Sequence, residues 1–138
     1  MPEESTTPDL RELTLQMAEA ASRGDGDAYM SHFAHDAVWQ TRFGTRLKGT
    51  TAICSYWGEF TGSVEGYRAE ILEFVDLGGG VTLWVARQGG RPSGSASELL
   101  EHLAFVVVFV DGLVESMTTY SDIDEARAAA ERLAEERG

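Results

Sequence analysis

Two histidines and an aspartate lie close together in the chain, in the pattern His32-x-x-His35-Asp36. Side chains at i and i+3 share one face of a helix, so the two imidazoles could meet at a metal ion. A three-ligand site needs a further partner, and the remaining histidine, His102, is predicted to lie on the other face of a sheet. Polar residues near a helix end are more often solvated surface groups. We therefore expect no metal site.

Other patterns of catalytic residues are weak. Cys54 lies early in a predicted helix without a base partner, which is more typical of a small, partly buried core residue than of a nucleophile. The triplet Gly78-Gly79-Gly80 has neither the spacing nor the following helix of a nucleotide-binding loop, and it predicts a turn. We expect neither a nucleotide nor any other cofactor.

Large aromatic side chains are the most prominent remaining feature. Tyr56, Trp57 and Phe60 recur at helical spacing, and Trp39 lies in a preceding predicted strand. Such residues more often form core than a ligand site. Where large aromatics line the open end of a curved sheet, however, they leave a concave apolar site, and the polar tips of Tyr and Trp orient a ligand. We expect at least two of these four residues to contact a ligand.

Helical periodicity and caps predict four helices. The first lies between Asp9, which forms a capping pattern with Glu12, and Gly24. The second begins at Asp25 and continues through Phe33. The third begins at Thr50 or Thr51, and the last follows Asp122 and has a stripe of Ile123, Ala126, Ala130 and Leu133.

Alternating and apolar runs predict strands at residues 37–41, 67–76, 81–88, 98–110 and 113–120. Turns are expected at residues 44–49, at 78–80 and at Asp111-Gly112, and residues 89–96 are expected to form a mobile loop. The run from Leu103 to Val110 is apolar on both faces. Because helices cover only one face of a small sheet, we expect a homodimer through the outer sheet face, with Trp84 in the interface.

Length and composition indicate a small soluble protein. The chain has 138 residues, which suits a disordered tail at residues 1–8 and a single domain at 9–138. A net charge of −12 disfavours nucleic acid and anionic membranes as partners. The sequence has no apolar stretch long enough to span a membrane, no secretory signal pattern and a single cysteine, so we expect a cytoplasmic location.

Several segments resemble the SnoaL-like group of the nuclear transport factor 2-like and ketosteroid isomerase-like superfamily. They are Gly24-Asp25-Gly26-Asp27-Ala28, Phe33-Ala34-His35-Asp36-Ala37-Val38-Trp39, Gly49-Thr50-Thr51-Ala52-Ile53 with Tyr56-Trp57, Asp111-Gly112-Leu113-Val114, and Tyr120-Ser121-Asp122 with Glu125-Ala126. The resemblance implies an α+β fold in which a cone-shaped curved antiparallel (mixed) sheet wraps around three N-terminal helices, with a short C-terminal helix added. It implies that Leu103, Phe105, Val107 and Phe109 point inward.

In this family a ligand enters the open end of the cone, so the resemblance implies a pocket for a small apolar organic molecule. The expected ligand-binding residues are Met17, Phe33, Trp39, Thr41, Tyr56, Trp57, Phe60, Phe105, Met117 and Thr119.

The resemblance does not extend to the catalytic residues of ketosteroid isomerases. Those enzymes need an aspartate base, and a tyrosine and a protonated aspartate that bind the oxyanion. This chain has Thr41, Met17 and Phe105 at the corresponding positions, and none of these titrates near neutral pH. We therefore do not expect ketosteroid isomerisation.

Glu101 and Arg87 remain as weak catalytic candidates with Thr41, since both are expected to point inward near the mouth. A carboxylate beside an arginine can act as an acid or base with an anion-binding partner. The alternative is an exposed ion pair at a rim.

Two functions follow from the sequence. One is a cofactor-independent cyclase, isomerase or dehydratase for a polyketide- or terpenoid-like metabolite. The other is a non-catalytic ligand-binding or dimerisation domain.

Overall fold

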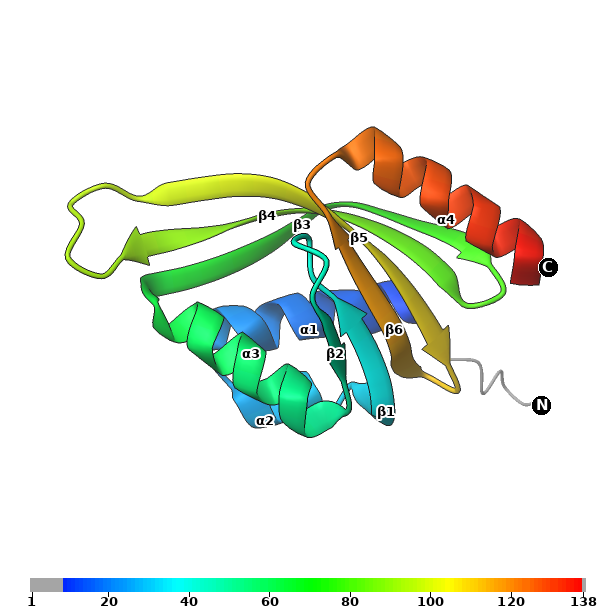
Figure 1. The fold of residues 1–138 in the computed structure, drawn as a ribbon, viewed down its shortest axis with the longest axis horizontal. Coiled ribbons are helices and arrows are strands. Elements are labelled where there is room, and N and C mark those ends of the chain that lie inside the picture. Colours follow the sequence, from blue (N-terminus) through cyan, green and yellow to red (C-terminus); the bar gives the residue numbers. More distant parts are fainter. Residues whose placement is uncertain (1–8, 138) are drawn as a thin grey trace.

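The computed structural model describes residues 9–137, so the tail expected at residues 1–8 lies outside the described residues. Within them the chain forms four helices and six strands (Figure 1). In order, these are α1 (Leu10–Arg23), α2 (Gly26–Met30), β1 (Phe33–Gln40), β2 (Arg46–Lys48), α3 (Thr50–Gly62), β3 (Val64–Gly78), β4 (Val81–Pro92), β5 (Leu99–Val110), β6 (Leu113–Tyr120) and α4 (Ile123–Arg137).

The strands form one mixed sheet in the order β2-β1-β6-β5-β4-β3. β1 runs parallel to β6, and the other neighbours are antiparallel. The sheet curves around α1, α2 and α3, while α4 lies against the opposite face (Figure 1). The expected α+β fold with a cone-shaped sheet is confirmed.

The N-terminal helices begin and end largely where their capping residues predict. The side chain of Asp9 accepts a hydrogen bond from the Glu12 amide, and Gly24 ends α1 in the left-handed region with φ 73°. α2, however, ends at Met30 and not at Phe33. The prediction was wrong because Phe33 pairs with Val114 of β6, so strand pairing decides the conformation of this segment.

The segment between β1 and α3 differs from the expected turn. It contains the short strand β2, which pairs with Val38, Trp39 and Gln40. The N-cap of α3 is Gly49, with φ 91° and no side-chain cap, so the expected cap at Thr50 or Thr51 was wrong. The Gly49 amide instead donates to the carbonyl of Ala37, which ties the start of α3 to β1.

Hairpins connect the last four strands. Asp111 and Gly112 both have positive φ, 53° and 80°, as the two-residue turn that suits twisted strands requires. The expected loop at residues 89–96 was too long, because β4 continues to Pro92. Gly89 pairs with Leu100, and a Cβ at Gly89 would overlap a neighbouring carbonyl oxygen, so glycine permits the close strand approach there.

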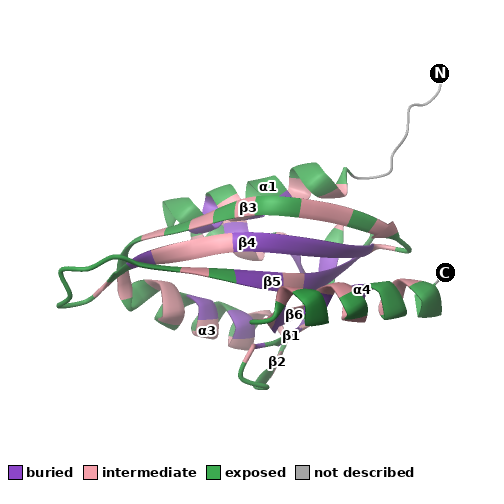
Figure 2. Ribbon diagram, turned by 90° about the horizontal axis from the view of Figure 1, so that it is seen from above, coloured by how far each residue is buried: buried purple, intermediate pink, exposed green. Residues whose placement is uncertain are grey.

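α4 buries the second apolar face of the sheet. Its small residues Ala126 and Ala130 are fully buried and pack with Val81, Leu83, Ala104, Val106 and Val108. This explains why the middle of β4 and β5 is buried while the edge strand β3 is mostly exposed or half-buried (Figure 2). With 15 residues, α4 is not the short helix expected. The dry outer face therefore does not by itself require a second subunit.

Trp84 lies on the concave face and not on the outer face, so its predicted place in a subunit interface was wrong. It is 5% exposed and packs beside Phe105, with a ring-centroid distance of 6.0 Å. Its Nε1 donates to Thr82 Oγ1 at 3.0 Å. Because β4 is apolar on both faces, alternation in the sequence could not tell which face is the inner one.

Candidate functional site

A cavity of about 110 Å³ lies between the concave face of the sheet and the N-terminal helices. Apolar and aromatic side chains dominate its lining. The lining residues are Met17, Ala18, Ala21, Tyr29, Trp39, Arg42, Phe43, Tyr56, Trp57, Phe60, Tyr67, Ala69, Ile71, Trp84, Ala86, Gln88, Glu101, Leu103, Phe105, Met117 and Thr119.

The structure brings most of the expected ligand-binding residues together around this cavity. Phe33 and Thr41 are the two that do not line it. Those that do are Met17, Trp39, Tyr56, Trp57, Phe60, Phe105, Met117 and Thr119. Their contact with a ligand stays a prediction.

Phe33 packs in the hydrophobic core instead, and Thr41 forms a hydrogen bond within a turn. Phe33 is 5% exposed and packs in the core against Tyr29 and Trp39, with ring-centroid distances of 5.3 Å and 6.3 Å. The hydroxyl of Thr41 accepts a hydrogen bond from the Thr45 amide at 3.2 Å, which closes the turn after β1. Thr41 is 4% exposed but does not line the cavity, and its contact with a ligand stays a prediction.

The aromatic wall is built from rings that contact one another. Tyr29 stacks on Trp57 with a centroid distance of 4.8 Å. Tyr56 packs edge-on against Trp39 at 5.5 Å, and aromatic packing of this kind fixes ring orientation. The concave shape is therefore held by side chains that restrain each other, and it does not depend on a ligand to form.

Four polar residues form a hydrogen-bonded series along the cavity, which we call the rim chain: Tyr67, Gln88, Glu101 and Arg42. Tyr67 Oη donates to Gln88 Oε1 at 2.8 Å, and Gln88 Nε2 donates to Glu101 Oε1 at 3.3 Å. Arg42 Nη1 lies 3.1 Å from Glu101 Oε2, and these two side chains are 26% and 27% exposed. Among the described residues, Glu101 is the only carboxylate that lines the cavity, and both of its oxygens are thus engaged.

Buried tyrosines line the same cavity. Burial raises the pKa of Tyr67 well above its usual value, and the nearby Glu101 carboxylate raises it further. Burial likewise raises the pKa of Tyr29, with a smaller contribution from Tyr67. Both hydroxyls stay protonated at neutral pH, so they can exchange hydrogen bonds with a ligand but do not act as bases.

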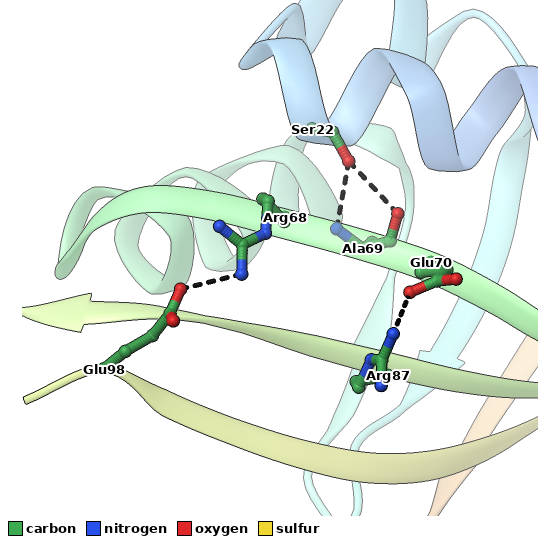
Figure 3. Close-up of polar contacts among 6 residues, drawn as sticks. All are labelled: Ser22, Arg68, Ala69, Glu70, Arg87 and Glu98. Carbon is green, nitrogen blue, oxygen red and sulfur yellow. Dashed lines mark hydrogen bonds and ion pairs between the residues drawn. The ribbon is translucent and has the colours of Figure 1, made fainter.

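Arg87 does not point into the cavity, and its predicted inward position was wrong. It forms an ion pair with Glu70 on the outer face, near a second pair between Arg68 and Glu98 (Figure 3). The Arg87 and Glu70 side chains are 42% and 58% exposed, as in the rim ion pair that was the alternative. The error is the same as for Trp84, since one wrong assignment of the faces of β4 misplaces both.

The arginine that meets Glu101 is Arg42, which sequence reasoning missed along with Gln88 and Tyr67. The alternation of Tyr67, Ala69 and Ile71 could have indicated the inner face of β3. Nothing comparable identifies Arg42, because it lies in a turn.

The three indole nitrogens differ in their surroundings. Trp39 Nε1 donates to Thr119 Oγ1 at 2.9 Å, and Trp84 Nε1 donates to Thr82. Trp57 Nε1 is buried without a hydrogen-bond partner, the one such side-chain atom in the part of the chain that the structure describes. A buried N–H without an acceptor is uncommon in folded proteins and needs an explanation.

The histidines do not assemble a metal site. His35 is exposed in β1 and His32 is half-buried in the preceding turn, where burial lowers its pKa. Within residues 9–137 no three His, Cys, Asp or Glu side chains are grouped for a metal ion.

No helix in this range has the length and apolar character needed to cross a bilayer. Cys54 is exposed and not partly buried as expected.

Comparisons with known proteins give a family and a set of similar folds. Residues 15–117 match the family model of the SnoaL-like domain. None of the curated protein sequences matches the chain. Among solved structures, a candidate polyketide cyclase from Sinorhizobium meliloti is 29% identical, with a TM-score of 0.65 over 82% of this chain and 94% of that one.

Two more distant structures show the same fold. A protein with a ketosteroid isomerase-like fold from Catenulispora acidiphila DSM 44928, solved in complex with trimethylamine, has a TM-score of 0.74 at 19% identity, over 91% of this chain and 94% of that one. A candidate SnoaL-like polyketide cyclase from Shewanella putrefaciens CN-32 has a TM-score of 0.71 at 10% identity, over 93% and 88% of the two chains.

Proposed function

This chain belongs to the SnoaL-like domain family, and from that membership we propose that it binds a small, mostly apolar organic molecule in the cavity. The observation that carries the proposal is the aromatic wall, which encloses a preformed concave space. Apolar cavities with a few placed polar groups are the usual form of small-molecule sites.

The volume limits the ligand. A cavity of about 110 Å³ is somewhat smaller than one of about 150 Å³ that holds benzene. A bulky polycyclic metabolite does not fit inside it as a whole. The enclosed part of the ligand is therefore a small ring or a short branched chain, and a larger polyketide- or terpenoid-like molecule would extend through the mouth.

As an enzyme, the protein would be a cofactor-independent cyclase, isomerase or dehydratase. The similar structure from Sinorhizobium meliloti, described as a candidate polyketide cyclase, favours this class. Glu101 would be the group that moves a proton, because no other described residue places a carboxylate in the lining, and Gln88, itself bonded to Tyr67, orients it. Ketosteroid isomerisation is not proposed, since Met17 and Phe105 line the cavity where that reaction needs acidic groups.

The alternative function is non-catalytic ligand binding. The engagement of Glu101 favours it, since both carboxylate oxygens already have partners in Gln88 and Arg42. A carboxylate held in this way stabilises the rim and has less freedom to take up a proton from a substrate.

The binding proposal is tested by filling the cavity. Ala86 is 4% exposed and lines it, so Ala86→Leu places extra side-chain volume inside. The matched control is Ala128→Leu on the exposed side of α4. We expect benzene to raise the melting temperature of the parent protein and of the control but not of Ala86→Leu. No shift in any of the three would contradict the proposal.

The proposal that the protein is an enzyme is tested by substituting Glu101, once a substrate is found. Glu101→Gln keeps the hydrogen-bonding shape and removes the proton carrier, so turnover should fall at least 100-fold, roughly the lower value for a lost general acid or base. The control is Glu98→Gln, which alters an exposed carboxylate of the outer-face pair with Arg68. Equal turnover in both variants would show that Glu101 is not the catalytic group.

We further propose that two copies pair through the part of the outer sheet face that α4 leaves open, and that the protein works in the cytoplasm. The exposed Leu100 lies in this part of the face, next to Arg87 and Gly89. The pairing is confined to this part of the face, because α4 already covers the apolar centre.

A further inference from the structure

We propose that the ligand is a small neutral alcohol and that Tyr29 and Tyr67 together bind its hydroxyl group. Tyr29 donates a hydrogen bond to the oxygen of that group, and Tyr67 Oη accepts one from its proton. The rest of the ligand is an apolar ring or a short branched chain. This inference rests on the proposed function, since it names the chemical class that the same cavity selects.

The hydroxyl of Tyr29 is free and accessible. Tyr29 is 7% exposed, and it lines the cavity. Its Oη forms no hydrogen bond with a described residue, and yet Trp57 Nε1 is the one side-chain polar atom in that part of the chain that is both unpartnered and enclosed on every side. Tyr29 Oη is therefore not enclosed. Because the ring itself packs between Trp57 and Phe33, the accessible surface of the hydroxyl faces the cavity.

The rim chain fixes which way each of its hydrogen bonds runs. Glu101 is paired with Arg42, and an ionised carboxylate only accepts, so Gln88 must present its amide N–H to it. The other end of the Gln88 amide is then an oxygen, which also only accepts. Tyr67 therefore donates its single proton to Gln88, at 2.8 Å. Any further hydrogen bond at Tyr67 Oη is one that this oxygen accepts.

The two phenols lie near each other with complementary capacity left. Tyr67 contributes to the raised pKa of Tyr29, which places their hydroxyls close together, and both residues line the cavity. Among the described residues, the bond with Gln88 is the only one that either phenol makes. A donor beside an acceptor matches an alcohol, which accepts one hydrogen bond and donates another. A carbonyl or ether oxygen would satisfy Tyr29 alone.

The ligand is neutral because the described lining offers no unbalanced charge. Its two charged groups are Glu101 and Arg42, which neutralise each other. A cation or anion in this small apolar space would lose its hydration without gaining a counter-charge.

The experiment compares cyclopentanol with methylcyclopentane, which has nearly the same shape and no polar group. Both are titrated into the full chain labelled with ¹⁵N, and NMR gives their affinities. Changes in cavity size affect both probes alike, so the ratio of the two affinities isolates the hydrogen bonds. We expect the preference for cyclopentanol to fall about two- to tenfold in Tyr29→Phe and in Tyr67→Phe. Tyr120→Phe removes a tyrosine hydroxyl on the α4 side of the sheet and should leave the ratio unchanged.

A third probe separates the roles of the two phenols. Cyclopentanone accepts a hydrogen bond but donates none. Its preference over methylcyclopentane should therefore fall in Tyr29→Phe and stay the same in Tyr67→Phe.

The variants differ in what they do to the protein without a ligand. Tyr29→Phe breaks no hydrogen bond within the described chain, so its melting temperature should match that of the parent protein. Tyr67→Phe also frees Gln88 and should melt at a lower temperature. Tyr29→Phe therefore gives a folded variant with which the inference can be refuted.

The outcomes separate the two proposals. If the probes bind but the preference for cyclopentanol is unchanged in Tyr29→Phe or in folded Tyr67→Phe, the inference is overturned and the apolar pocket stands. If none of the three probes binds at any soluble concentration, the proposed function fails and this inference fails with it.

Discussion

At the scale of single residues, neighbouring side chains hold polar groups of the cavity lining in place. Trp39 and Thr119 satisfy each other at 2.9 Å, although they lie on different strands. Glu101 is held by Gln88 and Arg42. The indole N–H of Trp57 differs from these groups, since it is buried without a hydrogen-bond partner.

The bond between Trp39 and Thr119 gives a stability prediction. Thr119→Val keeps the shape of the side chain and leaves a buried indole N–H unpaired, so the free energy of unfolding should fall by about 1–3 kcal/mol. Urea denaturation measures the change. Thr118→Val, at a half-buried site on the other face of β6, is the control and should change stability much less. An equal loss in both variants would show that the hydrogen bond is not the cause.

The raised pKa values of Tyr29 and Tyr67 predict a pH dependence. Below the ordinary tyrosine pKa of 10.0, the hydroxyls are protonated in both states and stability is unaffected. As the pH rises above that value, the unfolded chain ionises while the folded chain does not, so stability falls. Denaturation at pH 8 and pH 11, values set on either side of that pKa, should show a smaller loss in Tyr67→Phe than in the parent protein. Identical losses would contradict the assigned burial effect.

Residue patterns predicted much of this site but not its polar part. The helical stripe of Tyr56, Trp57 and Phe60 was identified because its spacing is regular and its side chains are large. Arg42 was missed because a turn has no periodicity from which a direction can be inferred. Which of the tryptophans lacks a partner depends on contacts across the sheet, and these have no sequence signal.

At the scale of elements, α4 explains a pattern that the sequence made ambiguous. β4 is apolar on both faces because one face meets the cavity and the other meets α4. Alternation identifies an inner face only when the outer face is polar, so Trp84 and Arg87 were assigned to the wrong sides. The helix caps at Asp9 and Asp122 were predicted correctly because they depend on a few neighbouring residues.

The packing of α4 gives a second stability prediction. Ala126 is fully buried against the sheet, so Ala126→Asp places an unpaired charge in an apolar contact and should destabilise the protein by at least about 3 kcal/mol. Ala128→Asp tests the same substitution on the exposed side of the same helix and should change stability little. Thermal denaturation followed by circular dichroism measures both. Equal melting temperatures would mean that α4 does not pack on the sheet in solution.

At the scale of the whole molecule, the two faces of the sheet have different surroundings. The concave face holds the cavity, and the outer face is divided between α4 and a region of charged pairs such as Arg87 with Glu70 (Figure 3). Exposed ion pairs contribute little to stability, but they can be exchanged between copies that meet face to face. The fold class followed from the order of elements, whereas the division of this face depends on where α4 packs.

The proposed pairing of copies predicts a concentration-dependent mass. Sedimentation at micromolar concentration should show a dimer, and Leu100→Asp should shift the protein toward monomer by placing a charge in the open part of the outer face. Phe43→Asp, at a side chain that is 77% exposed on the cavity side, is the control and should leave the mass unchanged. A parent protein that sediments as a monomer would exclude the dimer.

The ion pair between Arg42 and Glu101 has a consequence for the kinetics of exchange. It joins the turn after β1 to β5 beside the cavity, and both partners are about a quarter exposed. A ligand that passes between them must wait for the pair to separate, and dissolved salt weakens partly exposed ion pairs. Entry and escape of even an uncharged ligand should therefore speed up together with ionic strength while the equilibrium constant stays nearly constant. The ion pair would then set how long a ligand stays bound and not how tightly it binds.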